Sequence, residues 1–219
     1  MTWRLLRYGP EIGFFGSAFF MVASVMTAVA YTGTVGEGYS PLNHWVSELG
    51  EMGVSGLALM FNVGLFVGGF ALALFFAALG VARRTRLAWL YVPVGVISGV
   101  SGALVGVFPM NNPAIHIVFA LGFFVLGWVA VGLASLDVWR RPEARFSRWQ
   151  PVLGAITVAV FLLFLSVYVP YLSSATSGDR PAFSIETVLE WLVLVGIIGW
   201  VLVGSWSWWR HSRGHRNTA

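Results

Sequence analysis

The 219-residue sequence contains no cysteine and no lysine. Without cysteine the chain has no disulfide, no thiolate nucleophile and no cysteine ligand for a metal. Without lysine it cannot form the Schiff base that retinal or pyridoxal phosphate requires, and it lacks the lysine of a phosphate-binding loop. A retinal pigment and a pump with its own nucleotide-driven motor are therefore excluded, and neither retinal nor a nucleotide is expected as a cofactor.

Charged residues are also scarce, at 10% of the chain, whereas 58% is apolar and 16% aromatic. This composition is typical of an integral membrane protein. Twelve of the thirteen arginines fall into four clusters: Arg4 and Arg7; Arg83, Arg84 and Arg86; Arg140, Arg141, Arg145 and Arg148; Arg210, Arg213 and Arg216. Short arginine-rich loops stay on the cytoplasmic side of a membrane. The net charge of +4 comes from these clustered arginines. It therefore indicates how the chain is oriented in the membrane and that it contacts anionic lipid, and we expect no nucleic-acid partner.

Two apolar runs lie between each arginine cluster and the next, which predicts six crossings with both termini in the cytoplasm. A crossing needs roughly 20 apolar residues. We expect the spans at about Ile12–Tyr31, Leu57–Val81, Leu87–Phe108, Ala114–Val138, Val152–Tyr171 and Ile185–Trp206. The first run is longer than the apolar part of a signal peptide, about 7–15 residues, and is read as a retained span. Residues 1–209 then form one all-α membrane domain, and residues 210–219 form a polar, frayed cytoplasmic tail.

The loop between the first two spans is unusually rich in polar and aromatic residues. Ser40 is a good helix N-cap, Pro41 suits the first helical position, and Gly53 is a natural end. Leu42, Trp45, Val46, Leu49 and Met52 recur at helical spacing, with Asn43, His44, Ser47, Glu48 and Glu51 on the opposite face. The pattern predicts an amphipathic helix over Pro41–Met52, about three turns long, lying at the membrane interface.

Polar residues inside or near the spans are the candidate functional residues. Glu190 lies within the sixth span, where an acid costs about 2.5–3.5 kcal/mol and is a functional hypothesis by default. We expect it to share a polar pocket with His116, which lies one turn inside the fourth span. Asn62 lies in the second span, where bonding to another helix is the favoured interpretation and substrate binding the alternative. Glu186, in the first turn of the sixth span, is expected to complement the helix dipole.

The expected interfacial helix adds further candidates. His44 and Glu48 lie four residues apart, so they could form half of a metal site with His116, although a solvated polar face is the simpler interpretation. Ser47 is a weak candidate nucleophile, because a serine needs an activating base and no serine-hydrolase motif surrounds it. Tyr39 and Arg180 are candidate substrate-binding residues, since Arg180 is the one arginine expected on the non-cytoplasmic side and could meet a phosphate or Glu190.

The polar loop and the later spans carry the motifs of a resemblance. The motifs are Tyr39-Ser40-Pro41, Val46-Ser47-Glu48-Leu49-Gly50, Phe61-Asn62, Gly106-Val107-Phe108-Pro109, and His116 followed by Ala120 and Phe123-Phe124. With them the chain resembles a prokaryotic family of six-span membrane proteins catalogued as domain of unknown function 998. More remotely, the serine–glycine stretch before the second span, His116 and Glu190-Trp191 resemble the eukaryotic DRAM/Sfk-type family. These resemblances imply a six-span fold in a cell membrane and a theme of outer-leaflet lipids, but no established reaction.

The leading functional hypothesis is an outer-face lipid-handling protein, in one form a lipid-modifying enzyme that uses acid–base chemistry with or without a divalent metal. Ser47, Glu48, Asn62, His116 and Glu190 would line its cleft. The alternatives are a small carrier or scramblase, and a non-catalytic partner of another membrane protein. Membrane lipids are the expected partners, a homo-oligomer is left open, and two histidines near the surface argue against haem.

Overall fold

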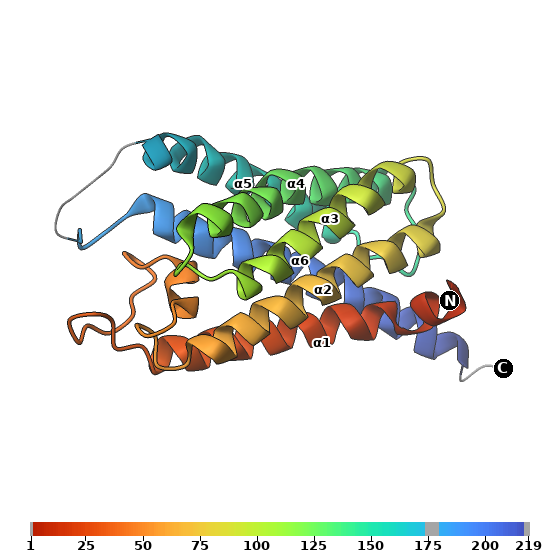
Figure 1. Cartoon of the computed structure of the whole chain (residues 1–219). Coiled ribbons are helices and arrows are strands. Elements are labelled where there is room, and N and C mark those ends of the chain that lie inside the picture. Colours follow the sequence, from red (N-terminus) through yellow and green to blue (C-terminus); the bar gives the residue numbers. More distant parts are fainter. Residues whose placement is uncertain (1, 174–179, 217–219) are drawn as a thin grey trace.

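The computed structural model describes residues 2–173 and 180–216, and these residues form a bundle of six long helices (Figure 1). The helices are α1 (Thr2–Val29), α2 (Ala58–Arg83), α3 (Ala88–Val107), α4 (Pro113–Arg140), α5 (Gln150–Ser173) and α6 (Ile185–Arg216). All six are long and apolar enough to cross a membrane, and no strand forms among the described residues. The chain is therefore an all-α, multi-pass membrane protein, as expected.

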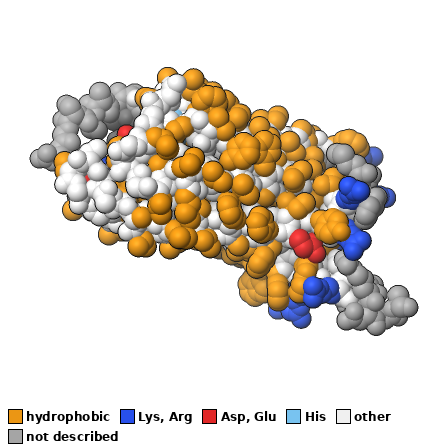
Figure 2. Space-filling view, turned by 60° about the horizontal axis from the view of Figure 1, so that its bottom comes forward, with side chains coloured by type: hydrophobic (Ala, Val, Ile, Leu, Met, Phe, Trp, Pro, Cys, Tyr) orange, Lys and Arg blue, Asp and Glu red, His pale blue; other side chains and the backbone are white. Residues whose placement is uncertain are grey.

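The two ends of the bundle differ in chemistry. Both chain termini lie at one end (Figure 1), which carries the four arginine clusters and is called the arginine end below. The opposite end carries the segments 30–57, 108–112 and 180–184 and is called the loop end. On the face shown in Figure 2, hydrophobic side chains cover the surface between the two ends, while arginines gather at the arginine end. This distribution is that of a helical bundle in lipid.

Each helix packs against its neighbours in sequence, and α6 closes the ring by packing on α1. The backbones of α2 and α3 approach closely, since a Cβ on Gly69 would meet the backbone of Gly99 and Ala103. Because lipid tails are as apolar as leucine, helices in membranes associate through such close van der Waals packing. Glycine at position 69 is therefore needed for the contact rather than for chemistry.

The half of the bundle nearer the arginine end is filled by large aromatic side chains. Phe75 and Phe76 of α2 pack against Trp200 of α6 with ring centroids 6.0 and 5.7 Å apart. All three rings are fully buried, and the Trp200 indole N–H donates to the Ser135 hydroxyl of α4 at 3.0 Å. This packing joins α2, α4 and α6 through buried aromatic side chains.

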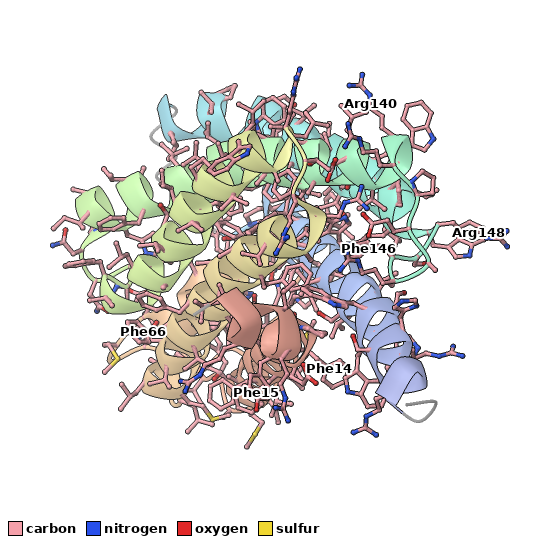
Figure 3. All side chains as sticks on the ribbon, turned by 90° about the vertical axis from the view of Figure 1, so that its right-hand side faces the viewer. Phe14, Phe15, Phe66, Arg140, Phe146 and Arg148 are labelled. Carbon is pink, nitrogen blue, oxygen red and sulfur yellow. The ribbon has the colours of Figure 1, made fainter. Side chains whose placement is uncertain are left out.

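A buried ion pair joins α2 to α4 at the arginine end. The Arg83 side chain is 0% exposed, and its Nε donates to Asp137 Oδ2 at 2.9 Å. Its remaining N–H groups donate to Glu143 Oε1 and to the backbone oxygens of Asp137 and Arg141, each at 2.8 Å. The guanidinium also lies over the ring of Phe146, which is buried, whereas Arg140 and Arg148 project from the same end (Figure 3). This network anchors the connection between α4 and α5.

The prediction of an interfacial α-helix over Pro41–Met52 is wrong in the length and the type of the helix. Only a single turn at residues 41–44 and a short 3₁₀ helix, η1 (Val46–Gly50), form there. Ser40 does begin the first turn, since its carbonyl oxygen accepts a hydrogen bond from the His44 N–H at 2.9 Å. The helix is then interrupted because the N–H groups of Trp45 and Val46 donate to the Glu48 and Glu190 carboxyl groups instead. Leu49 is buried as expected, but His44 and Glu48, placed on a solvated face by the sequence pattern, are buried too.

Two span boundaries also extend beyond the expected ones. Helix α1 begins at Thr2 rather than Ile12, and α6 continues to Arg216, so residues 210–216 of the expected frayed tail are helical. Residues 217–219 lie outside the described part of the chain. Both extensions carry arginine clusters, and long arginine side chains can follow a helix out of the apolar layer and reach the polar interface.

Candidate functional site

A cavity lies mainly in the half of the bundle nearer the loop end and is lined by residues of α1, α2, α3, α4, α6 and η1. Its walls are apolar and include Phe20, Phe61, Val105, Phe124, Leu194 and Ile198. Polar side chains line it mainly at the loop end, where Ser47, His116 and Glu190 all reach it. The cavity is thus an apolar chamber with a polar end.

Small residues create this space. Gly68, Gly69 and Ala71 of α2, Gly102 of α3 and Ala120 of α4 line the cavity. Along α6 the lining runs from Glu190 to Val201, which is about 16 Å at 1.5 Å per residue. The space open to the centres of water-sized molecules is about 90 Å³, whereas one water needs about 10–15 Å³. The cavity is therefore narrow, but as long as one bilayer leaflet is deep.

Glu190 marks the polar end of the cavity from the side of α6. It lies on the second turn of that helix and is 7% exposed. Its Oε2 accepts the backbone N–H of Val46 in η1 at 2.6 Å. Among the described residues, no group donates a hydrogen bond to Oε1, and this oxygen is not fully buried. One carboxyl oxygen therefore holds η1 in place, while the other is free to meet a ligand.

His116 approaches the same end from α4 and is 6% exposed. Helix α4 begins as expected, with Asn112 as its N-cap and Pro113 as its first residue. The ring Nδ1 lies 3.0 Å from the carbonyl oxygen of Phe108. A carbonyl can only accept, so Nδ1 carries the proton and Nε2 is left as an acceptor in the neutral ring. The expectation that Glu190 and His116 share a pocket agrees with the structure, because both line this cavity.

Ser47 is the third polar residue of the cavity and lies half-buried in η1. Its hydroxyl donates to the Met110 sulfur at 3.2 Å. This hydrogen bond thus goes to a thioether rather than to a histidine or a carboxylate. A thioether cannot act as a general base, so the site offers Ser47 as a hydrogen-bonding group rather than as an activated nucleophile.

A latch of hydrogen bonds closes the loop end, formed by residues 180–184 against residues 42–48. Arg180 makes a bidentate pair with Glu48, at 3.0 and 2.8 Å, and also donates to the Asn43 carbonyl oxygen at 2.8 Å. The Asn43 side chain donates back to the Pro181 carbonyl oxygen at 3.0 Å, and the Ser184 N–H donates to the Leu42 carbonyl oxygen at 2.8 Å. Hydrogen bonding to Glu48 raises the pKa of Arg180 above its ordinary value. The sequence suggested Arg180 as a partner of a phosphate or of Glu190, but the structure commits it to Glu48.

Aromatic rings pack beside the latch. Tyr39 lies edge-on to Tyr31 and Trp191, with ring centroids 5.4 and 6.1 Å away. The Trp191 indole donates to the Tyr39 hydroxyl at 2.8 Å, and that hydroxyl donates to the Trp45 carbonyl oxygen at 3.1 Å. Burial raises the pKa of Tyr39 above its ordinary value. Tyr39 therefore braces η1 against α6 through a neutral hydroxyl group.

The residues suggested for a metal site lie in three different environments. His44 packs against Tyr31 and Tyr39, Glu48 pairs with Arg180, and His116 bonds to Phe108. Within residues 2–173 and 180–216, no group of three His, Cys, Asp or Glu side chains is placed to hold a metal.

Asn62 supports the site from below η1. Its amide donates to the Gly50 carbonyl oxygen at 2.9 Å, so this hydrogen bond fixes the end of η1 rather than joining two membrane helices. Glu186 accepts a hydrogen bond from the Ser184 hydroxyl at 2.7 Å in the first turn of α6. The sequence did not indicate Val46, whose backbone N–H holds Glu190, because a backbone donor has no residue-type signal.

Comparison with known proteins places the chain in a family. No curated protein and no solved structure matches it. The family described as "Protein of unknown function (DUF998)" matches residues 15–207, which include all of the cavity except Gly13. The chain therefore belongs to the DUF998 family.

Proposed function

We propose that this protein binds an amphiphilic lipid in the cavity, with the polar group of the lipid at Glu190, His116 and Ser47. The observation that carries the proposal is the form of the cavity: apolar walls about 16 Å long ending in two buried polar side chains that retain free hydrogen-bonding atoms. A buried, unpaired polar group is costly. A ligand with one polar end offsets that cost while its chain fills the apolar part.

The gathering of the arginine clusters at one end of the bundle supports a site in the outer leaflet. The positive-inside rule assigns the arginine end to the cytoplasm, so the loop end and its cavity would open to the non-cytoplasmic side. The arginine half is packed by Trp200 and its phenylalanine neighbours. That packing favours a site that serves one leaflet over a carrier with a path to both sides, and over a scramblase.

A lipid-modifying enzyme is the more specific form of the proposal. His116 presents an acceptor nitrogen and Glu190 a carboxyl group to one cavity, and such a pair can remove a proton from a ligand and return it. The Phe108 carbonyl sets the histidine tautomer, as the orienting group of a catalytic base does. A role as a non-catalytic partner of another membrane protein requires no such cavity.

Crosslinking with a photoactivatable alkyl probe tests lipid binding. The protein would be purified in polymer-bounded membrane particles, irradiated with an alkyl diazirine, and mapped by peptide mass spectrometry. We expect labels on the cavity-lining parts of α2, α4 and α6. Ala120→Phe fills the cavity from α4 and should abolish this labelling. The matched control is Val125→Phe, which adds the same ring on the lipid-exposed side of α4 and should leave the labelling unchanged.

The outcome of this experiment separates the alternatives. Labelling only of lipid-exposed residues, unchanged by Ala120→Phe in a monodisperse protein, would refute the proposal. If the cavity is labelled, incubation of membranes with the bound lipid distinguishes enzyme from binding protein. A product that disappears in His116→Gln, while labelling persists, identifies an enzyme.

A further inference from the structure

The polar end of the cavity contains no positive charge among the described residues. The chain has no lysine, and twelve of its arginines lie in the clusters of the arginine end. The remaining one, Arg180, is held in the latch, where its two terminal nitrogens bond to Glu48 and to the Asn43 carbonyl oxygen. An anionic group in the cavity would have no side-chain cation to pair with.

The groups that do face the cavity favour a neutral partner. Glu190 brings a carboxyl group, His116 an acceptor nitrogen and Ser47 a hydroxyl. A phosphate or carboxylate would enter a site without a side-chain cation, and burying an unpaired charge is costly. A primary ammonium would form a buried ion pair with Glu190, whose attraction is largely offset by desolvation.

A hydroxyl group can pair with this end of the cavity without burying a charge. Its one donor can serve either His116 Nε2 or the free oxygen of Glu190, and its oxygen can accept the Ser47 hydroxyl in place of the Met110 sulfur, which is a weak acceptor. The narrowness of the cavity, in which only about 90 Å³ is open to the centres of water-sized molecules, favours a single chain over the two chains of a phospholipid. Its length of about 16 Å suits a lauryl chain.

Resting on the proposed function, we infer that the ligand class is a single-chain alcohol: an alkyl or isoprenoid chain ending in an uncharged hydroxyl, or a monoacylglycerol. Charged single-chain lipids and diacyl phospholipids are excluded from the same position. The chemistry of the site is then that of a hydroxyl group, which the Glu190 and His116 pair can bind or deprotonate.

Competition among four probes of equal chain length tests the inference. Dodecanol, laurate, dodecyl phosphate and dodecylamine would each compete with the alkyl diazirine for the cavity of the full chain in membrane particles. Dodecanol should compete at least about tenfold more strongly than each charged probe, a factor that corresponds to about 1.4 kcal/mol. Equal or stronger competition by laurate, dodecyl phosphate or dodecylamine overturns the inference.

A charge added at the polar end provides the matched variant. Ser47→Lys places an ammonium beside the cavity from a half-buried position, and it should raise the competition by laurate at least about tenfold. Thr34→Lys adds the same charge at an exposed position of the loop end and should change nothing. If Ser47→Lys fails to fold, the order of the four probes on the unmodified chain still decides. Absence of cavity labelling in the unmodified chain overturns the proposed function itself, whereas labelling with an anionic preference overturns only the inference about the alcohol.

Discussion

Substitution of Arg83 is expected to produce the largest loss of stability of any single charged residue in this protein. Arg83 and Asp137 have side chains only 0% and 2% exposed, and Arg83 makes four hydrogen bonds of 2.8–2.9 Å to α4 and the segment that follows it. Arg83→Met preserves the length of the chain but leaves the Asp137 carboxylate buried without its cation. Breaking one partner of a buried pair costs about 3–5 kcal/mol, so we expect a loss of that size.

This loss is measured by unfolding the protein with a denaturing detergent in mixed micelles and monitoring the helix content by circular dichroism. The double variant Arg83→Met/Asp137→Leu removes both charges and should recover at least about 2 kcal/mol relative to the sum of the single variants. Arg86→Met, at an exposed position three residues away, should change the free energy of unfolding by less than about 0.5 kcal/mol. A cost below about 1 kcal/mol for Arg83→Met, or additivity in the double variant, would refute the assignment of Arg83 as the buried counter-ion of Asp137.

Three further predictions concern the loop end and the orientation. Arg180→Gln should lower stability by about 1 kcal/mol, because the ion pair with Glu48 is partly exposed, and it should speed hydrogen exchange in residues 42–48; unchanged exchange would contradict the latch. A reporter fused after Arg216 should be active only in the cytoplasm, and activity on the opposite side would reverse the topology. Burial raises the pKa of both Tyr31 and Tyr39, so the folded state holds these protons more tightly than the unfolded chain. Their stabilisation is present below about pH 10 and falls as the pH rises further; unfolding curves of Tyr39→Phe should lose part of this alkaline decline.

The contrast between Asp137 and Glu190 separates a structural acid from a functional one. Both are acids buried within long apolar helices. Asp137 has a buried arginine against it, so its charge is compensated within the protein. Glu190 has only a backbone N–H on one oxygen and a cavity beside it. The compensated acid stabilises the fold, whereas the uncompensated acid is the one available to a ligand.

The site predicted from the sequence was partly correct, because the position of a residue along its helix can be counted from the sequence. Glu190 and His116 were expected together because each lies within two turns of the same end of its own span, and the bundle places both on the cavity. The same reasoning failed for Glu48, because its partner Arg180 lies 132 residues away, in a loop whose path no local pattern specifies. Asp137 lies close in sequence to the arginines at 140–148, but its partner is Arg83, 54 residues earlier in the chain.

The sequence by itself determined the number of helices and the difference between the two ends of the bundle. Apolar runs of sufficient length must satisfy their own backbone hydrogen bonds in a membrane, so each becomes a helix whatever its neighbours are. The tertiary structure alone decided the form of the loop between α1 and α2, because the N–H of Val46 bonds to Glu190, 144 residues away, and so interrupts the helix that local spacing favours. It also decided which small residues bring helices together and which leave a cavity. Gly69 does both, since it meets the backbone of α3 and also lines the cavity. Helix formation depends on groups a few residues apart, whereas cavities and buried partners depend on which helices pack together.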